Sequence, residues 1–245
     1  MKIIDLLRLE VMKAVNMKFP IIVSGYFFVS SIYFFFVFSI MTTTKIWINK
    51  STVDIFIEQN YIGAIIFFAI VALINIGIDY NKMIYAKQYV SGISKYEFIF
   101  GKFLFIILFS IILILLELIK FFIIQLLVTN QISIDVKILY KITLSFFVIL
   151  YITGTYAFLV VTIFKRTIIS AVILYLIFKA EQIVEVYENM NSDTGISNFF
   201  PFKIVNNLLK NFIMEPIHFI VLFIYFLISV FFITYLLKKG EIRFN

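Results

Sequence analysis

Residues 103–128 read FLFIILFSIILILLELIKFFIIQLLV, a run of 26 residues in which only Ser110, Glu117, Lys120 and Gln125 are polar. A helix needs about 20 mainly apolar residues to cross a hydrocarbon core roughly 30 Å thick. This stretch is therefore expected to cross a membrane as a single helix.

The composition of the whole chain agrees with a membrane protein. Of its 245 residues, 63% are hydrophobic and 14% are charged, and the mean hydropathy is +1.07, whereas soluble domains carry roughly 25% charged residues. The chain has no cysteine and one histidine, His218. This excludes disulfides, thiolate metal sites, cysteine catalysis and histidine-based metal centres or triads.

Five further apolar runs resemble residues 103–128, so we predict an all-α polytopic membrane protein with one transmembrane domain over residues 1–245. The six spans are expected at about 19–41, 61–78, 103–128, 142–164, 168–190 and 217–237. The fifth is the weakest, because it reaches spanning length only by continuing through Lys179, Glu181 and Glu185.

The basic residues predict the orientation. With the N-terminus inside, 13 of the 21 Lys and Arg residues fall in cytoplasmic segments, which is the distribution that the positive-inside rule favours. Both termini are thus expected in the cytoplasm, with the spans in the cell (plasma) membrane. The net charge of +7 is then loop charge, so a nucleic-acid partner is not expected.

Residues 1–18 precede the first span and read as a helix with Ile4, Leu7, Val11 and Val15 along one side, flanked by charges that include Glu10 and Lys13. Such a segment can lie in the inner membrane interface. A short basic tail is the alternative interpretation of residues 1–18.

On the other side of the membrane, residues 191–216 form the expected outer loop.

The segment 81–102, NKMIYAKQYVSGISKYEFIFGK, is the longest cytoplasmic connection. Gly92 stands where a glycine ends a helix, and Ser94 with Glu97 forms a capping box that starts the next one. We therefore predict a helix-turn-helix that leads straight into the third span, with Lys87, Lys95 and Lys102 around it. It either only reverses the chain or presents a docking surface to a cytoplasmic partner.

Several segments resemble ABC-2 type transporter permeases. Gly92 to Lys102 (GISKYEFIFGK) is similar to that family's loop after the second span, and Leu6 to Lys13 is similar to its N-terminal interfacial segment. Asn198 to Phe202 (NFFPF) resembles its outer loop before the last span. The size and layout are most like those of small bacterial permeases that handle bacteriocin-type or other amphipathic peptides, in export or immunity.

The resemblance implies a non-catalytic permease subunit of an ATP-binding cassette exporter, driven by a separate cytoplasmic ATPase and paired with a second permease chain, identical or related. Because the chain has no Gly-x4-Gly-Lys-Ser/Thr loop, ATP and Mg²⁺ are expected on the ATPase and no cofactor or metal on this chain. The residues expected to couple the two proteins are Lys87, Gly92, Ser94, Lys95 and Glu97.

Ionisable residues within spans are costly and call for an explanation. Glu117 and Lys120 are neighbours on one helix face. They either form a structural ion pair or snorkel toward the outer interface, or they line a substrate pathway or the permease–permease seam. Glu181, Glu185 and Glu188 share another face. They mark either a solvated outer helix end or a negative vestibule that favours cationic peptides.

Two other function classes remain as alternatives. One is the substrate-binding membrane component of an ATPase-driven uptake system, which also has about six spans but no expected cytoplasmic helix-turn-helix. The other is an intramembrane enzyme, although the sequence contains no catalytic pair or motif of the known kinds. A secondary transporter should show internal repeats, and no convincing repeat is present.

Overall fold

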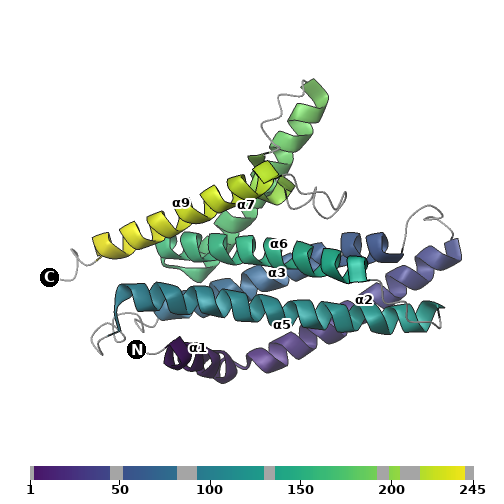
Figure 1. Cartoon of the computed structure of the whole chain (residues 1–245), viewed down its shortest axis with the longest axis horizontal. Helices are drawn as coiled ribbons and strands as arrows, with labels where there is room; N and C mark the ends of the chain where they lie inside the picture. Colours follow the sequence, from purple (N-terminus) through teal and green to yellow (C-terminus); the bar gives the residue numbers. More distant parts are fainter. Residues whose placement is uncertain are drawn as a thin grey trace.

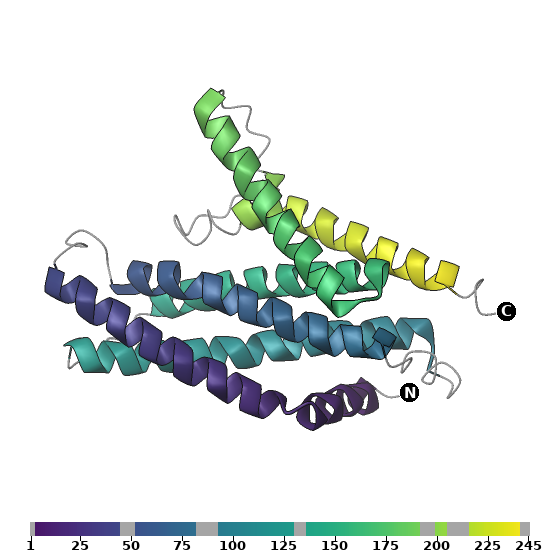
Figure 2. The ribbon, with the colours of Figure 1, turned by 180° about the vertical axis from the view of Figure 1, so that it is seen from behind.

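The computed structural model describes residues 3–44, 52–81, 93–129, 136–191, 199–204 and 216–240, and within these ranges all regular structure is helical, with no strand. Six of the helices are long and apolar enough to cross a membrane, as predicted from the sequence. The architecture is that of a multi-pass membrane protein. In Figures 1 and 2 the start of the first helix, Ile3–Asn16, and the end of the last helix, Pro216–Gly240, lie at the same end of the helical bundle, which we call the terminal end.

Three long helices form the centre of the bundle: α3 (Thr52–Asn81), α5 (Lys95–Thr129) and α6 (Val136–Phe164). They pack against one another (Figure 1), and 56–61% of their spanning residues are buried. Aromatic rings fill much of the space between them, such as Phe68 against Phe109, with ring centroids 5.4 Å apart, and Phe103 against Phe158 at 5.5 Å. We call these three helices the central core.

The N-terminal helices α1 (Ile3–Asn16) and α2 (Phe19–Thr44) flank this core. They meet at a bend where Lys18 adopts a left-handed backbone with φ of 58°, a conformation that is uncommon outside glycine and asparagine. Only 6% of the spanning residues of α2 are buried within the chain. We call α1 and α2 together the N-terminal arm.

The last two spans, α7 (Thr167–Asn191) and α9 (Pro216–Gly240), lie on the other side of the core. The fifth apolar run forms one unbroken helix through Lys179, Glu181 and Glu185. Its first half packs on α3 and α6, and its far end extends away from the bundle (Figures 1 and 2). The connection from α6 is a tight turn in which Lys165 has φ of 54°.

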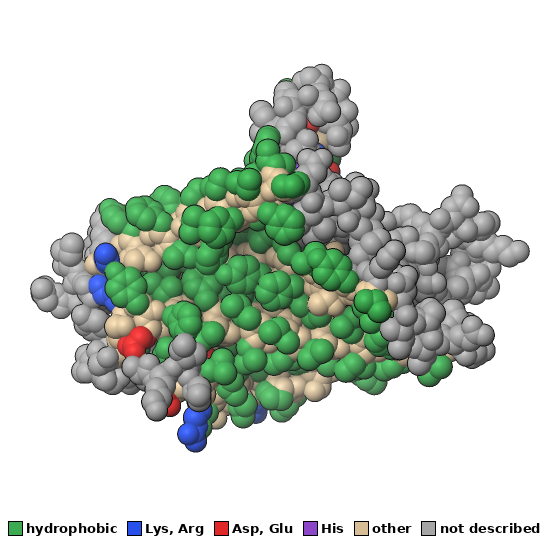
Figure 3. Space-filling view, in the orientation of Figure 1, with side chains coloured by type: hydrophobic (Ala, Val, Ile, Leu, Met, Phe, Trp, Pro, Cys, Tyr) green, Lys and Arg blue, Asp and Glu red, His purple; other side chains and the backbone are tan. Residues whose placement is uncertain are grey.

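The surface of the bundle matches a membrane setting. In Figure 3 apolar side chains cover the middle of the visible face, and Lys, Arg, Asp and Glu side chains are seen near the terminal end. Large exposed apolar residues also continue onto the outer face of α1, where Met12 and Val15 are 51% and 56% exposed. A soluble protein rarely exposes an apolar area this wide.

Candidate functional site

The described part of the predicted coupling segment begins at Ile93, so Lys87 and Gly92, and with them the first helix and turn of the expected helix-turn-helix, lie outside the described residues. The predicted capping box is present. The Ser94 backbone N–H donates to Glu97 Oε2 at 2.8 Å, and the Glu97 N–H donates to Ser94 Oγ at 3.2 Å. Two backbone donors at the start of α5 are thereby satisfied, so α5 starts at Lys95 and continues unbroken into the third span.

A cluster of buried charges lies about two turns further along α5. Lys102 is fully buried, and its Nζ donates to Glu10 Oε2 of α1 at 2.9 Å and to Asn75 Oδ1 of α3 at 3.1 Å. It also forms an ion pair with the carboxylate of Asp79, near the end of α3. One lysine therefore joins three helices.

Lys13 of α1 completes this cluster. Its Nζ donates to Asp79 Oδ1 at 2.8 Å and to Glu10 Oε1 at 3.1 Å. Burial by itself lowers the pKa of Lys13, but the Glu10 and Asp79 carboxylates outweigh burial, and the net pKa is raised. We call Glu10, Lys13, Asn75, Asp79 and Lys102 the inner charge cluster. The charges of its two acids and two lysines cancel, so that each buried ion has partners of opposite charge.

The inner charge cluster corrects two expectations from the sequence. The sequence pattern places Lys102 among the charges around the helix-turn-helix, and Glu10 and Lys13 among the charges that flank an apolar stripe. Instead, α1 turns Leu6 and Glu10 inward, each at most 5% exposed, while Val11 and Val15 face outward. The available sequence signals were Asp79 at the end of an apolar run and the Glu10–Lys13 pair three residues apart, but neither identifies the partner on another helix.

A second cluster lies deeper in the bundle. Lys120 Nζ is 2.7 Å from Glu117 Oε2, and both side chains are 1% exposed. From α2, Tyr26 donates its hydroxyl to Glu117 Oε1 at 3.0 Å, and Lys120 donates to Ser30 Oγ at 3.2 Å. We call these four residues the mid-span cluster. The Glu117–Lys120 ion pair, one of the arrangements expected from the sequence, is present and faces α2 of the same chain.

Two of the acids of α7, Glu181 and Glu185, lie near a described part of the outer loop. Glu181 accepts the Phe202 backbone N–H at 3.0 Å, at the start of a short helical turn over residues 201–204. Phe202 is buried against the rings of Tyr156 and Phe178. Glu185 shares a small cavity of about 40 Å³ with Glu181 and Lys203, and Glu188 is 7% exposed. Glu181 thus helps to hold the outer loop, a contact that its spacing in the sequence did not indicate.

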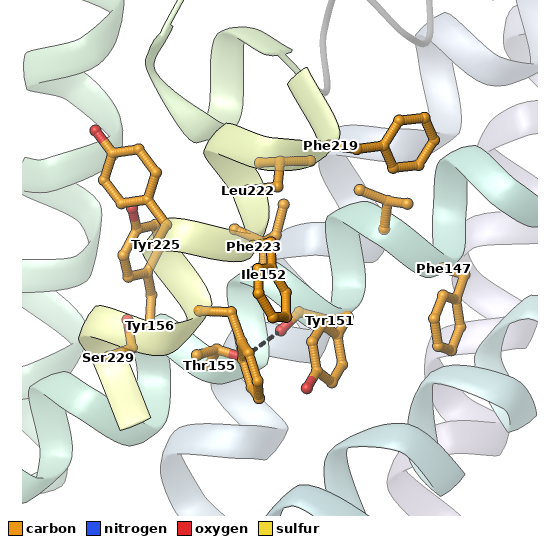
Figure 4. Close-up of a pocket in the computed structure, with 12 residues that line it drawn as sticks. Phe147, Tyr151, Ile152, Thr155, Tyr156, Phe219, Leu222, Phe223, Tyr225 and Ser229 are labelled. Carbon is orange, nitrogen blue, oxygen red and sulfur yellow. Dashed lines mark hydrogen bonds between the residues drawn. The ribbon is translucent and has the colours of Figure 1, made fainter. Parts of the chain in front are cut away.

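A groove of about 330 Å³ lies between α6 and α9 at the depth of the spans. In Figure 4 Tyr156 and Tyr225 lie at one end of it and Phe147 and Phe219 at the other. The Thr155 hydroxyl donates a hydrogen bond to the Tyr151 backbone carbonyl at 2.9 Å, within its own helix. The lining is therefore almost wholly apolar and aromatic, which suits a hydrophobic or amphipathic ligand.

Within the described residues, no group of three or more His, Cys, Asp or Glu side chains could hold a metal ion. Comparisons with family models, with curated proteins and with solved structures found no match for this chain.

Proposed function

We propose that the chain is the membrane-spanning permease subunit of an ATP-binding cassette exporter, driven by a separate cytoplasmic ATPase. Six membrane-spanning helices support a transport role. The resemblance of residues 92–102 to ABC-2 type permeases supports the subunit class. In this proposal the terminal end faces the cytoplasm of a bacterial cell, in agreement with the distribution of basic residues.

The observation that carries the proposal is the start of α5. A capping box at Ser94 and Glu97 gives this helix a defined first turn at the terminal end, directly after the segment 82–92. Tyr96 in the same turn is 63% exposed. A rigid, partly exposed helix start can transmit a push from a docked protein into the spans, which a flexible loop cannot do.

The cargo that we propose is an amphipathic peptide or another hydrophobic molecule, with cationic peptides favoured. The aromatic groove between α6 and α9 supports a hydrophobic cargo, and the acids of α7 support a cationic one. Part of that negative charge is used within the chain, because Glu181 binds the Phe202 backbone. Glu185 is therefore the acid whose replacement tests the charge preference most directly.

The substrate-binding component of an uptake system remains the second candidate. It is favoured by the same six spans and the same apolar groove. Export and uptake differ in direction, so vesicles of known orientation distinguish the two.

The test is co-purification from native membranes. A tagged chain extracted in mild detergent is expected to bring a soluble ATPase with it, and the complex is expected to hydrolyse ATP. Gly92→Val should weaken this association, because a β-branched residue resists the positive φ expected at a helix-ending glycine. Gly25→Val is the matched control, since Gly25 on α2 has open space around it.

A chain that purifies alone and shows no nucleotide effect would contradict the permease proposal. An intact complex with Gly92→Val would contradict only the assignment of the docking turn. Transport of a fluorescent cationic peptide into inverted vesicles would then separate export from uptake.

A further inference from the structure

The N-terminal arm is joined to the core in an unusual way. In the most apolar stretch of its spanning helix α2, only 6% of the residues are buried within the chain, against 56–61% in the corresponding stretches of the central core. Polar contacts occur at two levels: the inner charge cluster ties α1 to α3 and α5, and the mid-span cluster ties α2 to α5. Between these levels, the chain bends at Lys18.

The inner charge cluster also lies at the base of the proposed docking segment. Asp79 is two residues before the end of α3, and Lys102 is seven residues after the start of α5. These two helices are the stems of the segment 82–92. The two helices can therefore carry a displacement to Asp79 and Lys102, and through these contacts to Glu10 and Lys13 of the arm.

The connectivity of the charges allows partners to be exchanged. Lys13 and Lys102 each contact both Glu10 and Asp79. If α1 slides along α5, each lysine can lose one carboxylate and keep the other, so no ion is left buried without a partner. Interdigitated apolar side chains would resist such sliding, because close packing would be lost. A single buried ion pair would also resist it, because separating the pair would leave two buried charges without partners.

From this arrangement we infer that the inner charge cluster is a sliding joint between the N-terminal arm and the helices α3 and α5. This inference rests on the proposed function, since a docked ATPase supplies the displacement. In its ATP-driven state, the joint shifts α1 along α5 while the core helices stay packed.

Cross-linking in the complex tests the joint, and the chain is suited to it because it has no cysteine of its own. A Cβ placed at Gly101 of α5 would lie 3.8 Å from Leu6 Cδ2 of α1. We would introduce Leu6→Cys with Gly101→Cys, co-purify the ATPase, and measure the cross-linking rate with a short bis-methanethiosulfonate reagent, in which each cysteine thiolate displaces one sulfinate. The control pair is Phe103→Cys with Phe158→Cys, where α5 and α6 of the central core pack with ring centroids 5.5 Å apart.

With MgATP, the Leu6–Gly101 rate should fall by about fivefold or more, the lower end of typical coupling between distant sites, while the control rate stays constant. Glu10→Gln should abolish this change and Glu10→Asp should retain it. Arg8→Gln, an exposed change on the same helix, should have no effect. A purely structural role for Glu10 would leave the nucleotide dependence intact.

The outcomes separate the joint from the function on which it rests. If no ATPase accompanies the wild-type chain, the permease proposal and the joint are both overturned. If the ATPase is present and hydrolyses ATP but the Leu6–Gly101 rate does not respond to MgATP, only the joint is overturned. A response that persists in Glu10→Gln would also overturn it.

Discussion

The central core and the N-terminal arm are held by different forces. Between α3, α5 and α6 the contacts are mainly apolar and aromatic, apart from those of Lys102 with Asp79 and Asn75. They leave little room, so that Gly154 of α6 packs directly against Ile106 and Phe68. The arm buries far less apolar surface and carries two sets of buried polar contacts. Burial from water does not drive helices together inside a bilayer, so close packing and polar contacts must do so. The core relies mainly on close packing, and the arm relies more on charge.

The largest effect should come from the inner charge cluster. Lys102→Met leaves Glu10 and Asp79 with a single lysine, and an uncompensated buried charge costs about 3–5 kcal/mol. Unfolding of the purified chain in detergent measures this loss. Lys238→Met, an exposed change at the same end, should stay within about 0.5 kcal/mol.

The double variant Lys102→Met with Asp79→Asn sharpens that result. It restores charge balance, because Glu10 and Lys13 remain paired at 3.1 Å. It should therefore be more stable than Lys102→Met alone. An equal or greater loss would show that Lys102 contributes through packing of its stem rather than through its charge.

The stability of the core should depend on side-chain volume, whereas the attachment of the arm should depend on charge. Gly154→Ala would place a Cβ 2.6 Å from Ile106 Cγ2 and 2.9 Å from Phe68 Cε1. Overpacking of this kind costs about 1–3 kcal/mol, and loss of stability in the same unfolding assay is expected. Gly25→Ala, with open space at its Cβ, should be neutral or slightly stabilising. Equal effects at the two glycines would contradict the contrast between core and arm.

Tyr26→Phe tests the deeper attachment of the arm. It removes the hydroxyl that donates to Glu117 and keeps the ring, which stacks on Phe67 at 4.1 Å. Hydrogen bonds between membrane helices are worth about 0.6–1.7 kcal/mol, so a loss within that range is expected. Tyr33→Phe on the exposed face of α2 should change nothing measurable.

The smallest effect should be at the start of α5. Ser94→Ala removes the side-chain acceptor for the Glu97 N–H, and loss of an exposed cap costs about 0.5–1 kcal/mol. Glu97→Gln keeps an acceptor for the Ser94 N–H and should cost less. Amide hydrogen exchange at residues 95–98 measures this fraying locally, and unchanged protection in Ser94→Ala would contradict the cap.

The sequence by itself determined the features that depend on local composition. Six long apolar runs predict six spans, because the thickness of a bilayer imposes a minimum length on each. Ser94 and Glu97 predict the start of α5, because a capping box is complete within four residues. The Glu117–Lys120 pair follows in the same way from the helical repeat.

Only the tertiary structure decided which charges meet across helices. Lys102 looked like a loop charge because its partners, Glu10 and Asp79, are distant in sequence, and nothing in the pattern of residues 1–18 shows which face of α1 turns inward. The contact of Glu181 with the Phe202 backbone was hidden for the same reason. Buried ions are tolerated only where opposite charges converge, and that convergence is a property of how the helices pack.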